Sequence, residues 1–186
     1  MIKIIKILRP ALMCFVVMSV ICGIFYTTAV TGVAQVIFPK KSNGSIIEVT
    51  LKDGTKQTYG SELIAQEFSK KEYLIGRPMG NSNLSPTSED QKHIVNDRIK
   101  WWHKLDPINN KAIPADLVTA SGSGVDPNIT PQAADYQVIR ISKERGISEK
   151  KVRDTVEKYT TGRLLGFLGE PSVNVLKVNL DLDGLI

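Results

Sequence analysis

The sequence contains few residues of the kinds that form disulfide scaffolds and metal sites. Of its 186 residues only two are cysteines and only two are histidines. Cys14 and Cys22 both lie in one apolar stretch near the N-terminus, so the rest of the chain can form no disulfide and no thiolate metal site. His93 and His103 lack the i,i+4 spacing with which one helix presents two metal ligands. These shortages exclude a disulfide-rich protein and a zinc ribbon.

An excess of one charge sign is also missing from most of the chain. The formal net charge is +5, from 24 Lys and Arg residues and 19 Asp and Glu residues. Residues 1–38 contain three basic residues and no acidic one, so residues 39–186 hold the other 21 basic residues and all 19 acidic ones, a net charge of only +2. Nucleic-acid-binding domains gather basic residues on one face. We therefore expect no nucleic-acid partner.

Motifs that bind phosphates or activate a nucleophile are absent as well. The sequence has no Gly-x4-Gly-Lys-Ser/Thr stretch, and the glycines at 162, 166 and 169 do not have the spacing of a dinucleotide-binding turn. The Ser-Gly-Ser-Gly run at 121–124 lacks the outer glycines that flank a hydrolase nucleophile. We therefore predict no catalytic residues, no metal ligands and no cofactor of the protein's own, which disfavours an anchored hydrolase.

A long uncharged run near the N-terminus is the most prominent feature that is present. Residues 11–30 contain no charge, and the uncharged stretch continues to residue 38. About 20 apolar residues in a helix span the hydrocarbon core of a bilayer. The alternative is a cleaved secretory signal, whose apolar region is shorter and ends at a small-x-small site that this run matches poorly. We predict a cytoplasmic tail at 1–10, a transmembrane helix at 11–36 and a folded domain at 37–186.

The basic residues around this run predict how it crosses the membrane. Lys3, Lys6 and Arg9 precede it, whereas Lys40 and Lys41 follow it. Short cytoplasmic segments are enriched in Lys and Arg, so the slight excess favours a cytoplasmic N-terminus. We therefore expect a single-pass protein of the cell membrane whose C-terminal domain is extracytoplasmic.

Small residues recur on one side of the predicted membrane helix. Ser19, Gly23, Thr27 and Thr31 are spaced by four positions and so lie along one stripe. Such residues let another helix approach closely, and their hydroxyls can hydrogen-bond across the contact. The alternative is that isolated small residues are common in membrane helices. If the stripe has a role, it is an interface with helices of a partner.

The remaining residues predict a small mixed α+β domain. Hydrophobic periodicity, capping residues and turn residues give the following elements: strands at 45–51 and 56–59 joined by a turn at 52–55, a helix at 61–68, a loop at 76–88, a helix at 88–103, an irregular stretch at 106–128, helices at 130–146 and 148–159, and a strand at 172–182 with a β-bulge at 176–177.

One loop is the best candidate for a functional segment outside the membrane helix. Residues 119–128 alternate Ser and Gly and then supply two side-chain oxygens, so the loop could hold an ion weakly or contact a partner. The alternative is ordinary turn chemistry that leads into a helix capped by Thr130. The candidate residues are Ser121, Gly122, Ser123, Gly124, Asp126 and Asn128.

The stretch that contains this loop also carries a family resemblance. Residues 114–127, Pro-Ala-Asp-Leu-Val-Thr-Ala-Ser-Gly-Ser-Gly-Val-Asp-Pro, closely resemble the signature of the C subunit of the Kdp-type potassium-transporting ATPase. Further matching stretches follow the family's order: 8–11 (Leu-Arg-Pro-Ala), 76–78 (Gly-Arg-Pro), 82–84 (Ser-Asn-Leu), 162–171 (Gly-Arg-Leu-Leu-Gly-Phe-Leu-Gly-Glu-Pro) and 173–180. The resemblance covers the whole chain, although 89–110 match only loosely.

The resemblance implies a non-catalytic accessory subunit of a high-affinity potassium import pump. Its partners would be a channel-like potassium-binding subunit and a P-type ATPase subunit that uses ATP and magnesium in the cytoplasm, together with membrane lipid and potassium as the transported ion. The family is also described as a catalytic chaperone that raises the ATP affinity of the hydrolysing subunit through a ternary complex with ATP. Because we place the domain outside the cell, we favour assembly support. A cytoplasmic nucleotide-responsive regulator would need the opposite topology.

Overall fold

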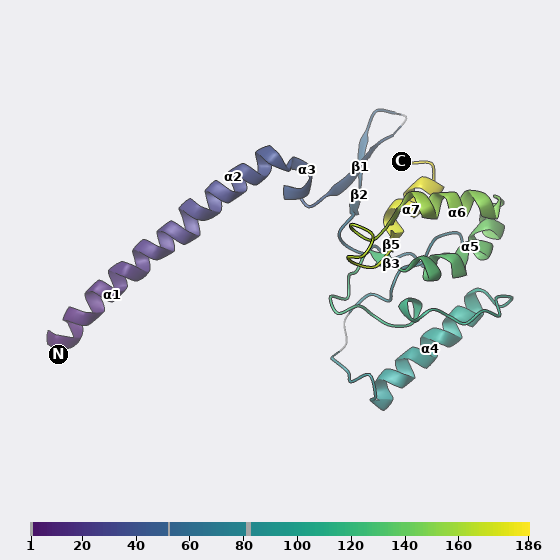
Figure 1. The fold of residues 1–186 in the computed structure, drawn as a ribbon, viewed down its shortest axis with the longest axis horizontal. Coiled ribbons are helices and arrows are strands. Elements are labelled where there is room, and N and C mark those ends of the chain that lie inside the picture. Colours follow the sequence, from purple (N-terminus) through teal and green to yellow (C-terminus); the bar gives the residue numbers. More distant parts are fainter. Residues whose placement is uncertain (1, 52, 81–82) are drawn as a thin grey trace. The chain divides into compact units, whose positions relative to one another are not determined.

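The computed structural model describes residues 2–51, 53–80 and 83–186. The chain forms two compact units, residues 1–45 and 46–186, and each is described by itself (Figure 1). Lys52 of the predicted turn, and Asn81 and Ser82 of the predicted 76–88 loop, lie outside the described residues. The elements are, in order, α1 (Ile2–Val20), η1 (Ile21–Tyr26), α2 (Thr27–Ile37), α3 (Pro39–Ser42), β1 (Ile46–Thr50), β2 (Lys56–Ser61), α4 (Glu89–Leu105), η2 (Ala115–Leu117), β3 (Asn128–Ile129), α5 (Pro131–Arg145), α6 (Glu149–Lys158), β4 (Thr160–Thr161), β5 (Ser172–Asn174) and α7 (Val175–Leu182).

The first unit is dominated by one continuous helical rod. It consists of α1, a short π-helical stretch η1, and α2. Lys6–Ile37, 32 residues with a mean hydropathy of 2.2, is long and apolar enough to cross a membrane, and none of its residues is buried. At about 1.5 Å per residue it exceeds the roughly 30 Å of a hydrocarbon core, which leaves room for tilt. The helix begins at Ile2, so it includes most of the predicted 1–10 tail.

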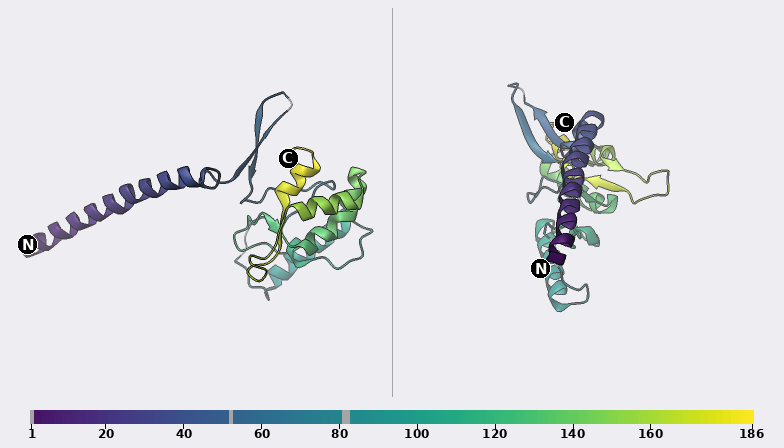
Figure 2. Two further views of the ribbon diagram at one scale, coloured as in Figure 1. Left: turned by 45° about the horizontal axis from the view of Figure 1, so that its top comes forward. Right: turned by 90° about the vertical axis from the view of Figure 1, so that its left-hand side faces the viewer.

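The second unit is the predicted mixed α+β domain, and it contains two small antiparallel sheets. One is the predicted hairpin of β1 and β2, with a register shift between Ile47 and Glu48. The other has the order β3-β5-β4, so its central strand is β5. Helices α5, α6 and α7 pack together around this sheet, as Figure 1 and the left view of Figure 2 show. The fold class predicted from the sequence is therefore confirmed.

Local capping signals place the starts of three helices where the sequence predicts them. The side-chain oxygens of Ser88, Thr130 and Ser148 accept hydrogen bonds from backbone N–H groups in the first turns of α4, α5 and α6. Helix α5 ends at Gly146, which has the left-handed conformation that glycine adopts readily (φ 64°). Trp102 is the buried residue of the predicted apolar face of α4, with a 1% exposed side chain.

The predicted helix at 61–68 is wrong. Strand β2 continues to Ser61, and no helix follows it before Phe68. The Ser61 hydroxyl accepts a hydrogen bond from Leu63 N, two residues on, which forms a turn instead of a helix cap. Ala65 N–H donates to the Val125 carbonyl over 2.9 Å. Long-range pairing of the backbone thus replaces the helix.

The predicted strand and β-bulge at 172–182 are also wrong beyond Asn174. The chain turns there into α7, because the Asn174 side chain caps the helix by accepting from Lys177 N. Helix α7 has two apolar faces, which explains why its apolar residues alternate in the sequence like those of a strand. Val175 and Val178 pack in the main core, whereas Leu176 and Leu180 pack against Ile47 and Val49 of β1. The change of phase that resembled a bulge is the change from one helix face to the other.

Candidate functional site

The small-residue stripe lies on an exposed part of the helical rod. Ser19 is in α1, Gly23 in η1, and Thr27 and Thr31 in α2, and all four are exposed. A Cβ atom added at Gly23 would meet no atom within 4 Å. The Thr27 hydroxyl donates to the carbonyl oxygens of Gly23 and Ile24. It therefore supplies hydrogen bonds to backbone acceptors of its own helix at the π-helical stretch. The partner-helix interface stays a prediction, and the face that it needs is open.

The candidate loop satisfies many of its polar atoms internally. Ser121 Oγ accepts from Gly124 N at 3.0 Å and lies 3.2 Å from Ser123 Oγ. Ser123 Oγ also accepts from Val125 N, and Asp126 Oδ1 accepts from the backbone N–H two residues on. These bonds are the turn chemistry that we named as the alternative for the loop.

The candidate loop is also fixed to segments that are distant in sequence. The Gly124 carbonyl accepts from Gly80 N over 2.9 Å, and the Pro127 carbonyl accepts from Val175 N over 3.1 Å. Asn128 Oδ1 accepts from the side-chain amide of Asn174 over 3.4 Å. Among the residues that the structure describes, no three His, Cys, Asp or Glu side chains gather where a metal could bind. An ion-holding or partner-contacting role of the loop stays a prediction.

A pairing that sequence reasoning missed joins two of the family-like stretches. Arg77 of the Gly-Arg-Pro stretch donates from Nη1 to Asp116 Oδ1 over 3.0 Å, and its Nη2 donates to Thr119 Oγ1 over 3.4 Å. Asp116 Oδ2 accepts from the backbone N–H of Thr130, the capping residue of α5, over 2.7 Å. The Arg77 and Asp116 side chains are only 23% and 14% exposed. One carboxylate therefore ties the 76–78 turn, the signature stretch and α5 together.

Two buried amides hold the extended segment that leads to Arg77. Asn179 of α7 accepts from Leu74 N and donates to the Leu74 carbonyl, both over 2.8 Å. Gln137 of α5 makes the same pair of bonds with Ile75, both over 2.9 Å. These side chains are fully buried and replace the neighbouring strand that a sheet would supply.

A guanidinium completes the support of this segment. Arg140 donates to the Lys71 and Tyr73 carbonyl oxygens and to Gln137 Oε1. Burial lowers the pKa of Arg140 to about 10, so the side chain is still charged at neutral pH. The segment 71–75 is thus fixed along its length by side chains from helices α5 and α7.

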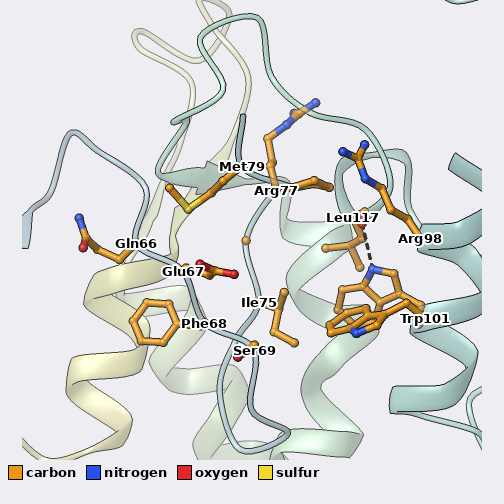
Figure 3. Close-up of a pocket in the computed structure, with 13 residues that line it drawn as sticks. Gln66, Glu67, Phe68, Ser69, Ile75, Arg77, Met79, Arg98, Trp101 and Leu117 are labelled. Carbon is orange, nitrogen blue, oxygen red and sulfur yellow. Dashed lines mark hydrogen bonds between the residues drawn. The ribbon is translucent and has the colours of Figure 1, made fainter. Parts of the chain in front are cut away.

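A small cavity of about 190 Å³ lies beside Arg77. In Figure 3 Phe68, Ile75 and the indole rings of α4 surround it, and the Arg77 and Arg98 guanidinium groups lie at one end. The dashed bond in Figure 3 runs from the Trp102 indole N–H to the Leu117 carbonyl, 2.9 Å away. Burial lowers the pKa of Arg98, whose Nη1 donates to the Val118 carbonyl. Sequence reasoning missed this cavity, because its walls come from four separate segments.

Comparison with known proteins gives the family. The family model of the K+-transporting ATPase c chain matches residues 8–184. The chain belongs to this family. Among its curated relatives, each named potassium-transporting ATPase KdpC subunit, that of Listeria monocytogenes serovar 1/2a is 56% identical over 183 residues, which cover 97% of this chain and 96% of the relative. Those of Clostridium perfringens and Methylococcus capsulatus are 45% and 44% identical, over 97% and 95% of this chain and 98% and 97% of each relative.

Membership in the family confirms the resemblance that the sequence stretches indicate. The match extends from Leu8 in α1 to Gly184 after α7, so it includes most of the rod and the Arg77–Asp116 pair. The one apolar helix that is long enough to cross a bilayer among the described residues fits a single-pass membrane protein.

Proposed function

We propose that this protein is a membrane-anchored, non-catalytic subunit of a potassium-transporting ATPase. Its rod crosses the cell membrane with the N-terminus in the cytoplasm, and its domain lies on the outer side. Its partners are a channel-like potassium-binding subunit and a P-type subunit that uses ATP and magnesium. The stripe of small residues packs against partner helices in the bilayer, and the domain supports assembly and activity outside it.

The observation that carries the proposal is the contrast between the two units of the chain. The domain packs its own core, from Leu74 through Val178, with side chains of residues 46–186. The rod, in contrast, exposes every side of a 32-residue apolar helix. Such a helix is stable only in lipid or against other apolar helices. A subunit of a membrane ATPase complex would meet both lipid and the apolar helices of other subunits.

The alternative is a catalytic chaperone that binds ATP directly with the hydrolysing subunit. Sites for drug-sized ligands usually enclose about 300–1,000 Å³. The cavity beside Arg77 has about 190 Å³, and the Nη1 atoms of its two guanidinium groups already donate to Asp116 and to the Val118 carbonyl. This cavity is therefore a poor nucleotide site. We favour assembly support because we place the domain outside the cell, where it cannot contact cytoplasmic ATP.

Site-specific labelling in intact cells tests the topology. The two native cysteines are replaced by Ala, and a single cysteine is introduced either at the exposed Asn110 of the domain or ahead of residue 1. A membrane-impermeant maleimide is applied to cells without an outer barrier. We expect Asn110→Cys to be labelled before permeabilisation, and the tail cysteine only after it.

The reverse pattern would overturn the proposed function. Labelling of the tail in intact cells together with protection of Asn110→Cys would place the domain in the cytoplasm, where a nucleotide-responsive regulator acts. A mature chain that begins near residue 30 would show that the apolar run is a signal and not an anchor.

A further inference from the structure

The loop between β4 and β5 exposes four large apolar side chains at its tip. They are Leu164, Leu165, Phe167 and Leu168, which are 69%, 77%, 69% and 48% exposed. In the right view of Figure 2 this yellow-green loop projects away from the helices of the domain. A contiguous apolar patch of this kind on a folded domain marks a surface that another molecule covers.

The tip is held in one shape before any partner binds. Leu164 and Leu168 exchange backbone hydrogen bonds, with N···O distances of 2.8 and 2.9 Å. At the turn Leu165 has a left-handed backbone (φ 54°), which is unusual for a residue other than Gly, Asn or Asp. Below the tip, Arg163 and Glu170 form an ion pair at 2.7 Å. A preformed apolar knob loses little conformational entropy when it enters a groove.

The composition of the tip favours a protein groove over a lipid surface. Loops and helices that lie on membranes combine apolar residues with Lys and Arg clusters, and Trp and Tyr are enriched at the membrane interface. Here the one basic residue, Arg163, is neutralised by Glu170, and the only aromatic residue is Phe167. The stretch 162–171 therefore has no net charge with which to attract anionic lipids.

We propose that this knob inserts into an apolar groove on the extracytoplasmic face of another subunit of the same ATPase. The inference rests on the proposed function, because it needs the domain to be outside the cell and in a complex. The span 38–45 between α2 and β1 reaches less than about 30 Å even when fully extended, so the domain stays close to the partners of the membrane helix. The knob gives the domain its second point of attachment.

The test compares retention of variants in the detergent-solubilised complex, purified through a tag on the hydrolysing subunit. The tip variant is Leu165→Asn with Phe167→Ser, since Asn tolerates the left-handed backbone. The matched control is Ile108→Ser, which removes a 64% exposed apolar side chain elsewhere. We expect the tip variant to be retained at least about tenfold less tightly than wild type, and the control to be unchanged.

Photo-crosslinking identifies what covers the tip. A benzophenone analogue of phenylalanine replaces Phe167 in the intact complex, and we expect a covalent adduct with another subunit. Adducts only with lipid, only with a second copy of this chain, or with nothing would overturn the proposal, as would unchanged retention of the tip variant. Failure of wild type to co-purify would instead refute the proposed function. Unaltered tryptophan fluorescence of the tip variant would show that it is folded.

Discussion

Replacing Asn179 tests how the domain fixes the segment that carries Arg77. Asn179 and Leu74 are both fully buried, and the Asn179 side chain makes both hydrogen bonds of the Leu74 backbone. In Asn179→Leu the side chain is similar in size but can make neither bond. Each buried backbone group left without a partner costs about 1–3 kcal/mol. Because leucine recovers part of this by burying more apolar surface, we expect a net loss of about 3 kcal/mol.

Equilibrium urea unfolding of the full-length chain in mild detergent measures this loss. Both tryptophans lie in α4 and Trp102 is buried, so fluorescence reports on the domain. With a urea dependence of about 2 kcal/mol per molar, the midpoint should fall by about 1.5 M. The same substitution at the exposed Asn96 of α4 is the control and should move the midpoint by less than about 0.3 M. An equally small shift for Asn179→Leu would refute the structural role of the amide.

Three further variants test the other features of the molecule. Asp116→Asn removes the charge that pairs with Arg77, and we expect it to lower the unfolding free energy in the same urea assay by about 1–3 kcal/mol. In Gly23→Leu the added Cβ atom would meet no atom within 4 Å, so we expect an unchanged fold but weaker co-purification of the pump. The control Val33→Leu lies off the stripe and should have no effect. Asp126→Asn keeps the acceptor of its turn and should leave assembly unchanged, so dissociation of the complex would show that the loop is an interface.

Local signals explain the parts of the fold that the sequence predicts correctly. Ser88, Thr130 and Ser148 cap their helices with acceptors placed three residues from the donor, so the information lies within one turn of chain. The hairpin of β1 and β2 is equally local. The apolar rod is predictable because its length and composition alone decide whether it can span a bilayer.

The two errors have a common cause, which is competition from distant residues. The 61–68 stretch has the periodicity of a helix, but Ala65 N–H finds its partner at Val125, far along the chain. In 175–182 the alternation of apolar residues fits a strand as well as a helix that packs against two cores. Only the position of Leu176 and Leu180 beside β1 decides between them. Neither contact can be predicted from the residues next to it in the sequence.

The same limit applies to the candidate site. Arg77 and Asp116 lie 39 positions apart, and both belong to stretches that resemble the family, yet nothing in their spacing predicts that they pair. The cavity beside Arg77 needs walls from 66–69, 75–79, α4 and Leu117. The turn chemistry of the candidate loop, in contrast, is predictable, because Ser and Asp accept from N–H groups two or three residues away.

If the domain supports assembly, as we propose, it acts on its partners through the shape and rigidity of its surface. Here the loops are not fixed by a large sheet, because the strands are short. Buried side chains fix them instead, since Asn179 and Gln137 replace a neighbouring strand and Asp116 fastens the 76–78 turn to α5. Each of these groups is buried or nearly so, where an unmade bond is costly. The polar interior therefore holds the outer loops in one shape, and the proposed binding of a partner subunit would need little reordering of them.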